Sequence, residues 1–135
     1  MRYAILAISL SIPLGLAMML ANPLARAADK EKPGRVLRHL VLYKFKDDLK
    51  PAQLQEVIDA FNGLPKKIDT IIGYEAGTNV SPEGKSDGLT HAFVVTFKDE
   101  AGRDKYLTHP AHQAYVDVVK DRRDKVVVFD YWGEK

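Results

Sequence analysis

The chain contains no cysteine, and it has no excess of charge of either sign beyond its first 27 residues. Without cysteine there is no disulfide framework, no thiolate metal site, no cysteine nucleophile and no lipidated N-terminal cysteine. The length of 135 residues allows one domain. With 46% hydrophobic and 28% charged residues, the composition is that of a globular protein and excludes a chain that is disordered throughout.

The N-terminus has the three parts of a secretory signal peptide. A basic start, Met1-Arg2, precedes an uncharged run over residues 3–21, and the small-residue pattern Ala-Arg-Ala follows at 25–27. These parts predict a signal peptide over residues 1–27 that is cleaved after Ala27. We therefore expect a periplasmic or secreted protein.

An uncleaved membrane anchor is the alternative, because the uncharged run is about long enough to span a bilayer. Pro13 and Gly15 interrupt this run, which favours the signal peptide. We expect contact with a membrane only through an uncleaved signal. The polar residues 28–34 that follow predict a flexible leader.

The charge balance of the exported chain argues against nucleic-acid binding. Two of the 20 basic residues, Arg2 and Arg26, leave with the signal, so the remaining 18 equal the 18 acidic residues. A nucleic-acid-binding domain needs a basic footprint, and here both signs are interleaved. The basic pairs at 66–67 and 122–123 are expected at helix ends, where cations suit the helix dipole.

Hydrophobic periodicity predicts an α+β domain with a β-α-β-β-α-β order. Alternating apolar residues predict strands, whereas apolar residues spaced by three and four predict helices. A helix starts at Pro51 and ends before Pro65, and a second helical region after Asp99 is broken by Pro110. This order is the ferredoxin-like pattern, one sheet with two helical regions on one face. The strands are predicted over residues 35–46, 68–80, 89–98 and 125–132.

The sheet face without helices is predicted to be apolar. Alternation along the strands places on it Leu40, Leu42, Val94, Val127, Phe129 and Tyr131. A large exposed apolar patch marks an interaction surface. We therefore expect a homodimer in which two sheets pack face to face and close a dimeric α/β barrel.

Four segments give the chain a resemblance to a known family. They are HLVLYKFK at 39–46, GLTHAFVVTFKD at 88–99, YLTHPAHQAYV at 106–116 and VVVFDY at 126–131. Together they resemble the stress-responsive dimeric A/B-barrel (Dabb) domain, over residues 35–132. The resemblance implies a ferredoxin-like protomer and a barrel dimer. It does not imply a single activity, since the family includes stress-induced proteins and a plant polyketide cyclase.

The residues with acid-base chemistry fall on few elements. All four histidines of the chain, with Tyr106 and Asp130, are expected to approach one cavity between the sheet and the helices. Asp130 on the last strand is placed to accept a hydrogen bond from His39, the imidazole–carboxylate pairing that general-base catalysis uses. The side chains expected to contact a ligand are His39, Val41, Ile58, Phe61, His91, Phe93, His109 and Asp130.

The resemblance also implies catalytic roles for Tyr106 and His112, which match the reactive Tyr and last His of the relative's Y-x-x-HPAH segment. His112 would remove a proton next to a carbonyl group, and Tyr106 would donate a hydrogen bond to the enolate oxygen. Such a reaction needs no metal and no organic cofactor. Pro110 also disturbs the pair His109 and His112 as metal ligands, so we expect no metal site.

Two functions stay open on the sequence. The first is a stress-responsive homodimer that binds a small apolar or aromatic molecule without turnover. The second is a cofactor-independent lyase or cyclase that acts on a polyketide-like carbonyl compound. Export favours the first, because polyketide thioesters are cytoplasmic, and the bulky Phe93 stands where a long acyl tail would need space. Structural roles are the alternative for the histidines: His39 and His91 as core residues, and His109 as a helix cap.

Overall fold

The sheet has four antiparallel strands in the order β2-β3-β1-β4. The computed structural model describes residues 34–135, so the predicted signal peptide and all of the predicted leader except Gly34 lie outside the described residues. Along the chain the elements are β1 (Arg35–Phe45), α2 (Pro51–Asn62), the 3-10 turn η1 (Leu64–Lys66), β2 (Ile71–Thr78), β3 (His91–Phe97), α3 (Glu100–Thr108), α4 (Pro110–Val119) and β4 (Arg123–Glu134). This order confirms the predicted ferredoxin-like α+β fold, in which α3 and α4 together form the second helical region.

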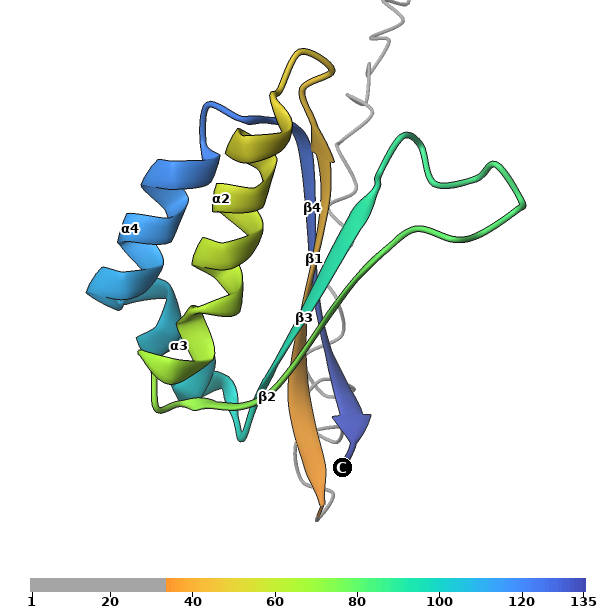
Figure 1. The fold of residues 1–135 in the computed structure, drawn as a ribbon. Helices are drawn as coiled ribbons and strands as arrows, with labels where there is room; N and C mark the ends of the chain where they lie inside the picture. Colours follow the sequence, from red (N-terminus) through yellow and green to blue (C-terminus); the bar gives the residue numbers. More distant parts are fainter. Residues whose placement is uncertain (1–33) are drawn as a thin grey trace, which may run out of the picture.

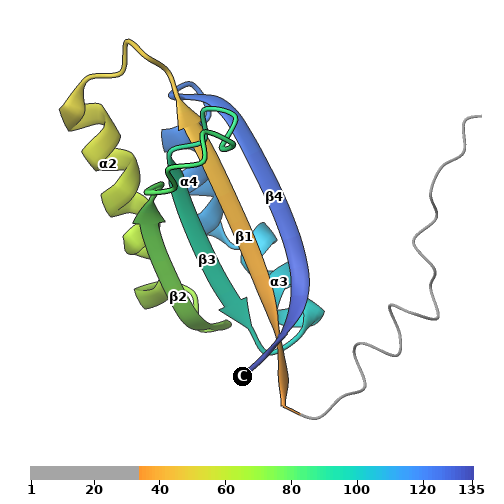
Figure 2. The ribbon, with the colours of Figure 1, turned by 90° about the vertical axis from the view of Figure 1, so that its right-hand side faces the viewer.

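The three helices cover one face of the sheet (Figure 1). Figure 2 shows the other face, on which no helix of the described residues lies. The hydrophobic core is buried between the two layers and includes Val57, Phe61, Phe93, Val95, Phe97 and Tyr106. Within residues 34–135, no helix is both long enough and apolar enough to cross a membrane.

The helices begin at the residues that the sequence predicted as helix starts. Pro51 is the first residue of α2, where its missing N–H costs no hydrogen bond. Asp99 caps α3, because its carboxylate accepts a hydrogen bond from the backbone N–H of Gly102 at 2.9 Å. His109 ends α3 and caps α4, since its Nδ1 accepts from the backbone N–H of Ala111 at 3.1 Å. Pro110 then starts α4. One residue therefore separates the two helices.

Three of the predicted strands have wrong boundaries at both ends. The strand predicted over 68–80 spans only Ile71–Thr78, because the chain after α2 winds into η1 and buries Ile68 beneath the helices. Val80, at its other end, is 90% exposed in the loop. The third strand begins at His91 and the last spans Arg123–Glu134.

The register confirms which residues share the helix-free face. Leu40 of β1 lies opposite Val94 of β3 and Phe129 of β4. Phe129 and Tyr131 are 59% and 43% exposed. These two aromatic rings and the neighbouring aliphatic side chains make the face an apolar surface of the kind that mediates protein association.

The connection between β2 and β3 extends away from the helices, beyond the plane of the sheet (Figure 1). It returns to the sheet through Gly88, which has a φ of +76°. This left-handed conformation is favourable only for glycine. A Cβ atom at Gly88 would also lie 3.0 Å from Cδ of Lys44.

Candidate functional site

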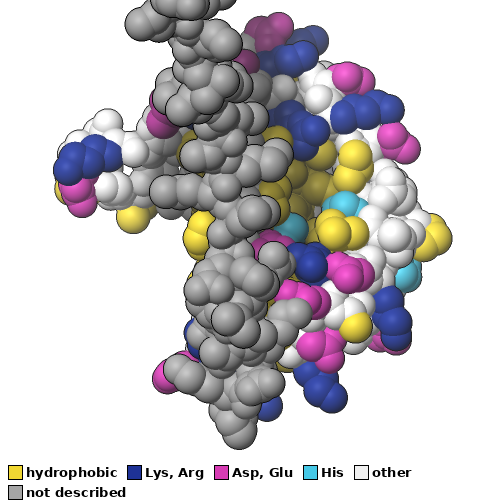
Figure 3. Space-filling view, turned by 180° about the vertical axis from the view of Figure 1, so that it is seen from behind, with side chains coloured by type: hydrophobic (Ala, Val, Ile, Leu, Met, Phe, Trp, Pro, Cys, Tyr) yellow, Lys and Arg dark blue, Asp and Glu magenta, His cyan; other side chains and the backbone are white. Residues whose placement is uncertain are grey.

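A cavity of about 360 Å³ opens between β4 and the helices α3 and α4. It exists because β4 is an edge strand: Val128 lies opposite Val41 and therefore faces the helix side, yet it is 55% exposed. The lining residues are His39, Val41, Tyr43, Phe61, Tyr106, Leu107, His112, Tyr115, Val116, Arg123, Val126, Val128 and Asp130. Figure 3 shows the molecule from behind, with hydrophobic and histidine side chains between basic side chains above and a mixed acidic and basic group below.

Asp130 joins His39 to a basic side chain that the sequence did not identify. The predicted hydrogen bond is confirmed, since His39 Nδ1 donates to Asp130 Oδ1 at 2.6 Å. The second carboxylate oxygen accepts from Arg103 Nη1, and Arg103 Nε donates to Asp104 Oδ1 at 2.7 Å. The carboxylate therefore fixes the orientation of the His39 ring through its Nδ1 atom.

Tyr106 and His112 lie next to each other because α4 starts so soon after α3. Their ring centroids are 4.3 Å apart. The ring of His39 also packs against Tyr106, with ring centroids 5.7 Å apart. Tyr106 is only 1% exposed. The three side chains therefore form a continuous row along the inner wall of the cavity.

The hydrogen bonds of His112 leave one ring nitrogen free to accept a proton. Its Nδ1 lies 3.1 Å from the carbonyl oxygen of Leu107. A carbonyl can only accept, so Nδ1 carries the proton and Nε2 is unprotonated. Burial lowers the pKa of His112, and the nearby His39 lowers it further, while the Leu107 carbonyl opposes both. At neutral pH His112 is thus a neutral base.

Tyr106 complements the base His112, because its phenol stays protonated and can donate a hydrogen bond. Burial raises the pKa of its phenol, and the neighbouring Tyr43 and Tyr74 add to that rise. The hydroxyl group stays protonated at neutral pH and can donate a hydrogen bond to an oxygen that gains negative charge. A base and a hydrogen-bond donor at this separation can together bind or enolise a carbonyl compound.

The structure brings some of the predicted site residues together and separates others. His39, Val41, Phe61, Tyr106, His112 and Asp130 line the cavity, whereas Ile58, His91, Phe93 and His109 do not. Phe93 instead stacks on Phe61 with centroids 4.2 Å apart. The ring of His109 caps α4. The expectation that all four histidines approach one cavity is therefore wrong.

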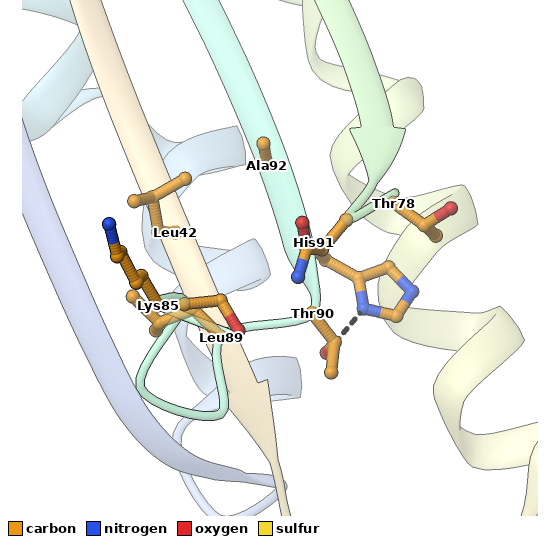
Figure 4. Close-up of a pocket in the computed structure, with 9 residues that line it drawn as sticks. Leu42, Thr78, Lys85, Leu89, Thr90, His91 and Ala92 are labelled. Atoms are coloured by element: carbon orange, nitrogen blue, oxygen red, sulfur yellow. Dashed lines mark hydrogen bonds between the residues drawn. The ribbon is translucent and has the colours of Figure 1, made fainter. Parts of the chain in front are cut away.

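His91 lies at a second, smaller cavity of about 280 Å³. Its position opposite Tyr43 confirms that it faces the helix side, but at the end of β3 that is remote from Asp130. Figure 4 shows its ring pointing away from Leu42 and Lys85, with Nδ1 hydrogen-bonded to the hydroxyl of Thr90 at 2.9 Å. Burial lowers the pKa of His91, which packs against the ring of Phe45. This histidine is partly buried at the edge of the core and lies apart from the cavity that contains His39 and His112.

The sequence missed seven lining residues and one supporting residue, Arg103: the seven are Tyr43, Leu107, Tyr115, Val116, Arg123, Val126 and Val128. Once the open edge at β4 is known, the helical spacing in α4 predicts that Tyr115 lines the cavity. Strand alternation in β4 predicts the same for Val126 and Val128. Arg123 was expected at a helix end and instead lies in β4 at the cavity. Across the described range 34–135, no three His, Cys, Asp or Glu side chains are grouped as metal ligands.

The fold and the cavity define a ferredoxin-like α+β protein with a pocket between its sheet and its C-terminal helix pair. Residues 37–133 match the model of the stress responsive A/B barrel domain. The chain belongs to this family.

Two curated relatives are similar over most of their length. The stress-response A/B barrel domain-containing protein HS1 of Arabidopsis thaliana is 33% identical over 70% of this chain and 87% of its own. Olivetolic acid cyclase of Cannabis sativa is 32% identical over 73% of this chain and 98% of its own.

Solved structures agree with the fold. A hydroxynitrile lyase from Passiflora edulis superposes with a TM-score of 0.71 and 25% identity, over 76% of this chain and 97% of its own. A dimeric ferredoxin-like protein of unknown function from Thermobifida fusca superposes with a TM-score of 0.62 and 25% identity, over 73% and 92%. The Thermobifida fusca protein is thus a dimeric relative, and a dimer is the assembly that the apolar sheet face predicts for this chain.

Proposed function

We propose that the protein is an exported homodimer that binds a small apolar or aromatic molecule in the cavity between β4 and the helices α3 and α4. The observation that carries this proposal is the cavity itself. Its volume of about 360 Å³ lies within the range of about 300–1,000 Å³ that small-molecule sites occupy. Its walls are aliphatic and aromatic, and a few polar groups converge in it, which is typical of such sites.

The homodimer is supported by the exposed apolar face and by the dimeric relatives. Phe129 and Tyr131 expose large rings on this face, which a second sheet would bury. Export to the periplasm or the outside of the cell is supported by the signal-peptide pattern of residues 1–27. A role in stress responses is supported by the family to which the chain belongs.

Catalysis is the second candidate function, and the pair Tyr106 and His112 favours it. His112 Nε2 would take the proton from a carbon next to a carbonyl group, and the Tyr106 hydroxyl would donate a hydrogen bond to the resulting enolate oxygen. The protein would then be a cofactor-independent lyase or cyclase. The cyclase and the lyase among its relatives support this class of reaction.

Native mass spectrometry of the protein purified from its own cells tests the binding proposal. We expect a homodimer that carries a co-purified small molecule. A monomer would refute the assembly. A dimer without any adduct, which also fails to take up aromatic compounds from a small-molecule library, would refute ligand binding.

Exchange of α-protons in D₂O tests catalysis, with phenylacetone as the probe. We expect the protein to accelerate the exchange and His112→Gln to reduce the acceleration on the order of 100-fold, as general-base catalysis contributes. His109→Asn is the matched control, because His109 lies outside the cavity and asparagine also caps helices. Equal acceleration by the parent and His112→Gln would refute His112 as the base, and a parent rate equal to that of buffer alone would leave binding without turnover.

A further inference from the structure

An irregularity in β4 turns Arg123 toward the cavity. Lys44 of β1 lies opposite Lys125, but the next residue, Phe45, lies opposite Arg123, so Asp124 is an extra residue in the strand. Regular pairing would place Asp124 opposite Phe45 and would send Arg123 to the helix-free face. A β-bulge of this kind re-aims the side chain next to it. Phe45 is buried on the helix side, and Arg123 accordingly lines the cavity.

Asp124 has a partner that holds the bulge in place. Its carboxylate accepts a hydrogen bond from Lys44 Nζ at 2.7 Å. This exposed ion pair involves the strand residue next to the bulge. The orientation of Arg123 is therefore set by backbone pairing, and the neighbouring ion pair reinforces it.

Arg123 differs from the other arginines around it in having no acidic partner. Arg122 pairs with Glu56 at 2.7 Å and also donates to the backbone oxygen of Gln53. Arg103 pairs with Asp104 and Asp130. Within the part of the chain that the structure describes, no carboxylate forms an ion pair with Arg123, although its side chain lines a largely apolar cavity. This end of the cavity therefore carries one uncompensated positive charge.

The hydroxyl group of Tyr115 is a second polar group at the same cavity. Its oxygen is buried and makes no hydrogen bond of normal geometry among the described residues. Burial raises the pKa of Tyr115, a weak hydrogen bond with the Tyr43 side chain adds to the rise, and the charge of Arg123 opposes it. A buried hydroxyl with so weak a partner is stabilised when a ligand forms a hydrogen bond with it.

We propose that Arg123 and Tyr115 form an anion-binding end of the cavity, and that the ligand is a small monocarboxylate with an apolar or aromatic body. A guanidinium and a phenol match the two oxygens of a carboxylate. One uncompensated positive charge matches a monoanion, whereas a phosphate dianion would need further donors. The body of the ligand would contact Val41, Phe61 and Val128.

This inference rests on the proposed function and specifies its ligand class. The rings of Tyr115 and His112 have centroids 6.4 Å apart on successive turns of α4. A carboxylate held at Arg123 and Tyr115 would therefore bring the adjoining carbon atoms of the ligand to His112. The anion-binding end would thus orient the ligand relative to the base.

Titration calorimetry with 2-naphthoate and its neutral analogue 2-naphthamide tests the inference on the full-length dimer. We expect the carboxylate to bind at least tenfold more tightly than the amide. Arg123→Gln should remove this preference, weakening 2-naphthoate about tenfold and leaving 2-naphthamide unchanged. Arg122→Gln is the matched control, because it removes the same charge one residue away and its guanidinium is paired with Glu56 outside the cavity.

The outcomes separate the two proposals. If both compounds bind with equal affinity, or if Arg122→Gln weakens 2-naphthoate as much as Arg123→Gln does, the anion-binding end is refuted and the apolar cavity remains. If neither compound binds at millimolar concentration, the proposed ligand-binding function is refuted as well. A circular-dichroism melt of each variant establishes that a loss of binding is not a loss of folding.

Discussion

Asp130→Asn is the most informative single change at the cavity, because Asp130 holds both His39 and Arg103. Asparagine has nearly the same shape, and its oxygen can still accept the hydrogen bond from His39 Nδ1. The NH2 group that replaces the second carboxylate oxygen can only donate, however, so it cannot accept a hydrogen bond from Arg103, and the negative charge between the two basic groups is lost. The change therefore removes one charge-assisted contact and weakens another.

The expected cost follows from the burial of the three side chains. A hydrogen bond to a charged group contributes about 1.5–3 kcal/mol when buried, and an exposed ion pair contributes about 0–1 kcal/mol. The side chains of His39, Arg103 and Asp130 are 7%, 17% and 26% exposed. Their contacts are therefore intermediate between a buried hydrogen bond and an exposed ion pair. We expect Asp130→Asn to lower the free energy of unfolding by about 2 kcal/mol, and the melting temperature by about 10 °C.

Urea unfolding, followed by the fluorescence of the single tryptophan, Trp132 in β4, measures this cost. Protomer concentration must be held constant, since dimerisation contributes to stability. Arg103→Met removes the contacts of Arg103 with Asp130 and with the more exposed Asp104, and should cost about 1 kcal/mol. The double variant should be only slightly less stable than Asp130→Asn alone, because both changes break the contact between Arg103 and Asp130. A cost of Asp130→Asn below about 0.5 kcal/mol, or strict additivity, would contradict the reasoning.

Two further predictions concern stability. Gly88→Ala should cost about 1 kcal/mol, because its φ of +76° is unfavourable for alanine; Gly77→Ala, whose Cβ would meet nothing within 4 Å, should cost less than half as much in the same unfolding assay. Burial lowers the pKa of both His112 and His91, so below pH 6.5 the unfolded chain binds protons that the folded chain excludes, and stability should fall as pH falls. His112→Gln should reduce that fall between pH 7.5 and pH 5.5, and an unchanged slope would contradict the lowered pKa.

Most of the fold could be predicted from the sequence, because strand alternation and helix ends are local properties. The pairing of Asp130 with His39 also followed from alternation alone, once the last strand was placed beside the first. The start of β2 could not be predicted in this way, since the 3-10 turn over Leu64–Lys66 depends on how Ile68 packs beneath the helices. For His109 the sequence favoured a helix cap and left a ligand contact open, and the backbone geometry decides for the cap.

The cavity itself depends on features that no local pattern contains. Its open side exists because β4 is an edge strand, which leaves Val128 exposed on the face that the helices otherwise cover. Its charge depends on a bulge that reverses the direction of a single side chain, Arg123. The sequence placed Arg123 at a helix end, and even a regular strand extended back to residue 123 would direct its side chain to the helix-free face. Tyr106 and His112 thus lie on one wall of this cavity, and one extra residue in β4 turns Arg123 toward it.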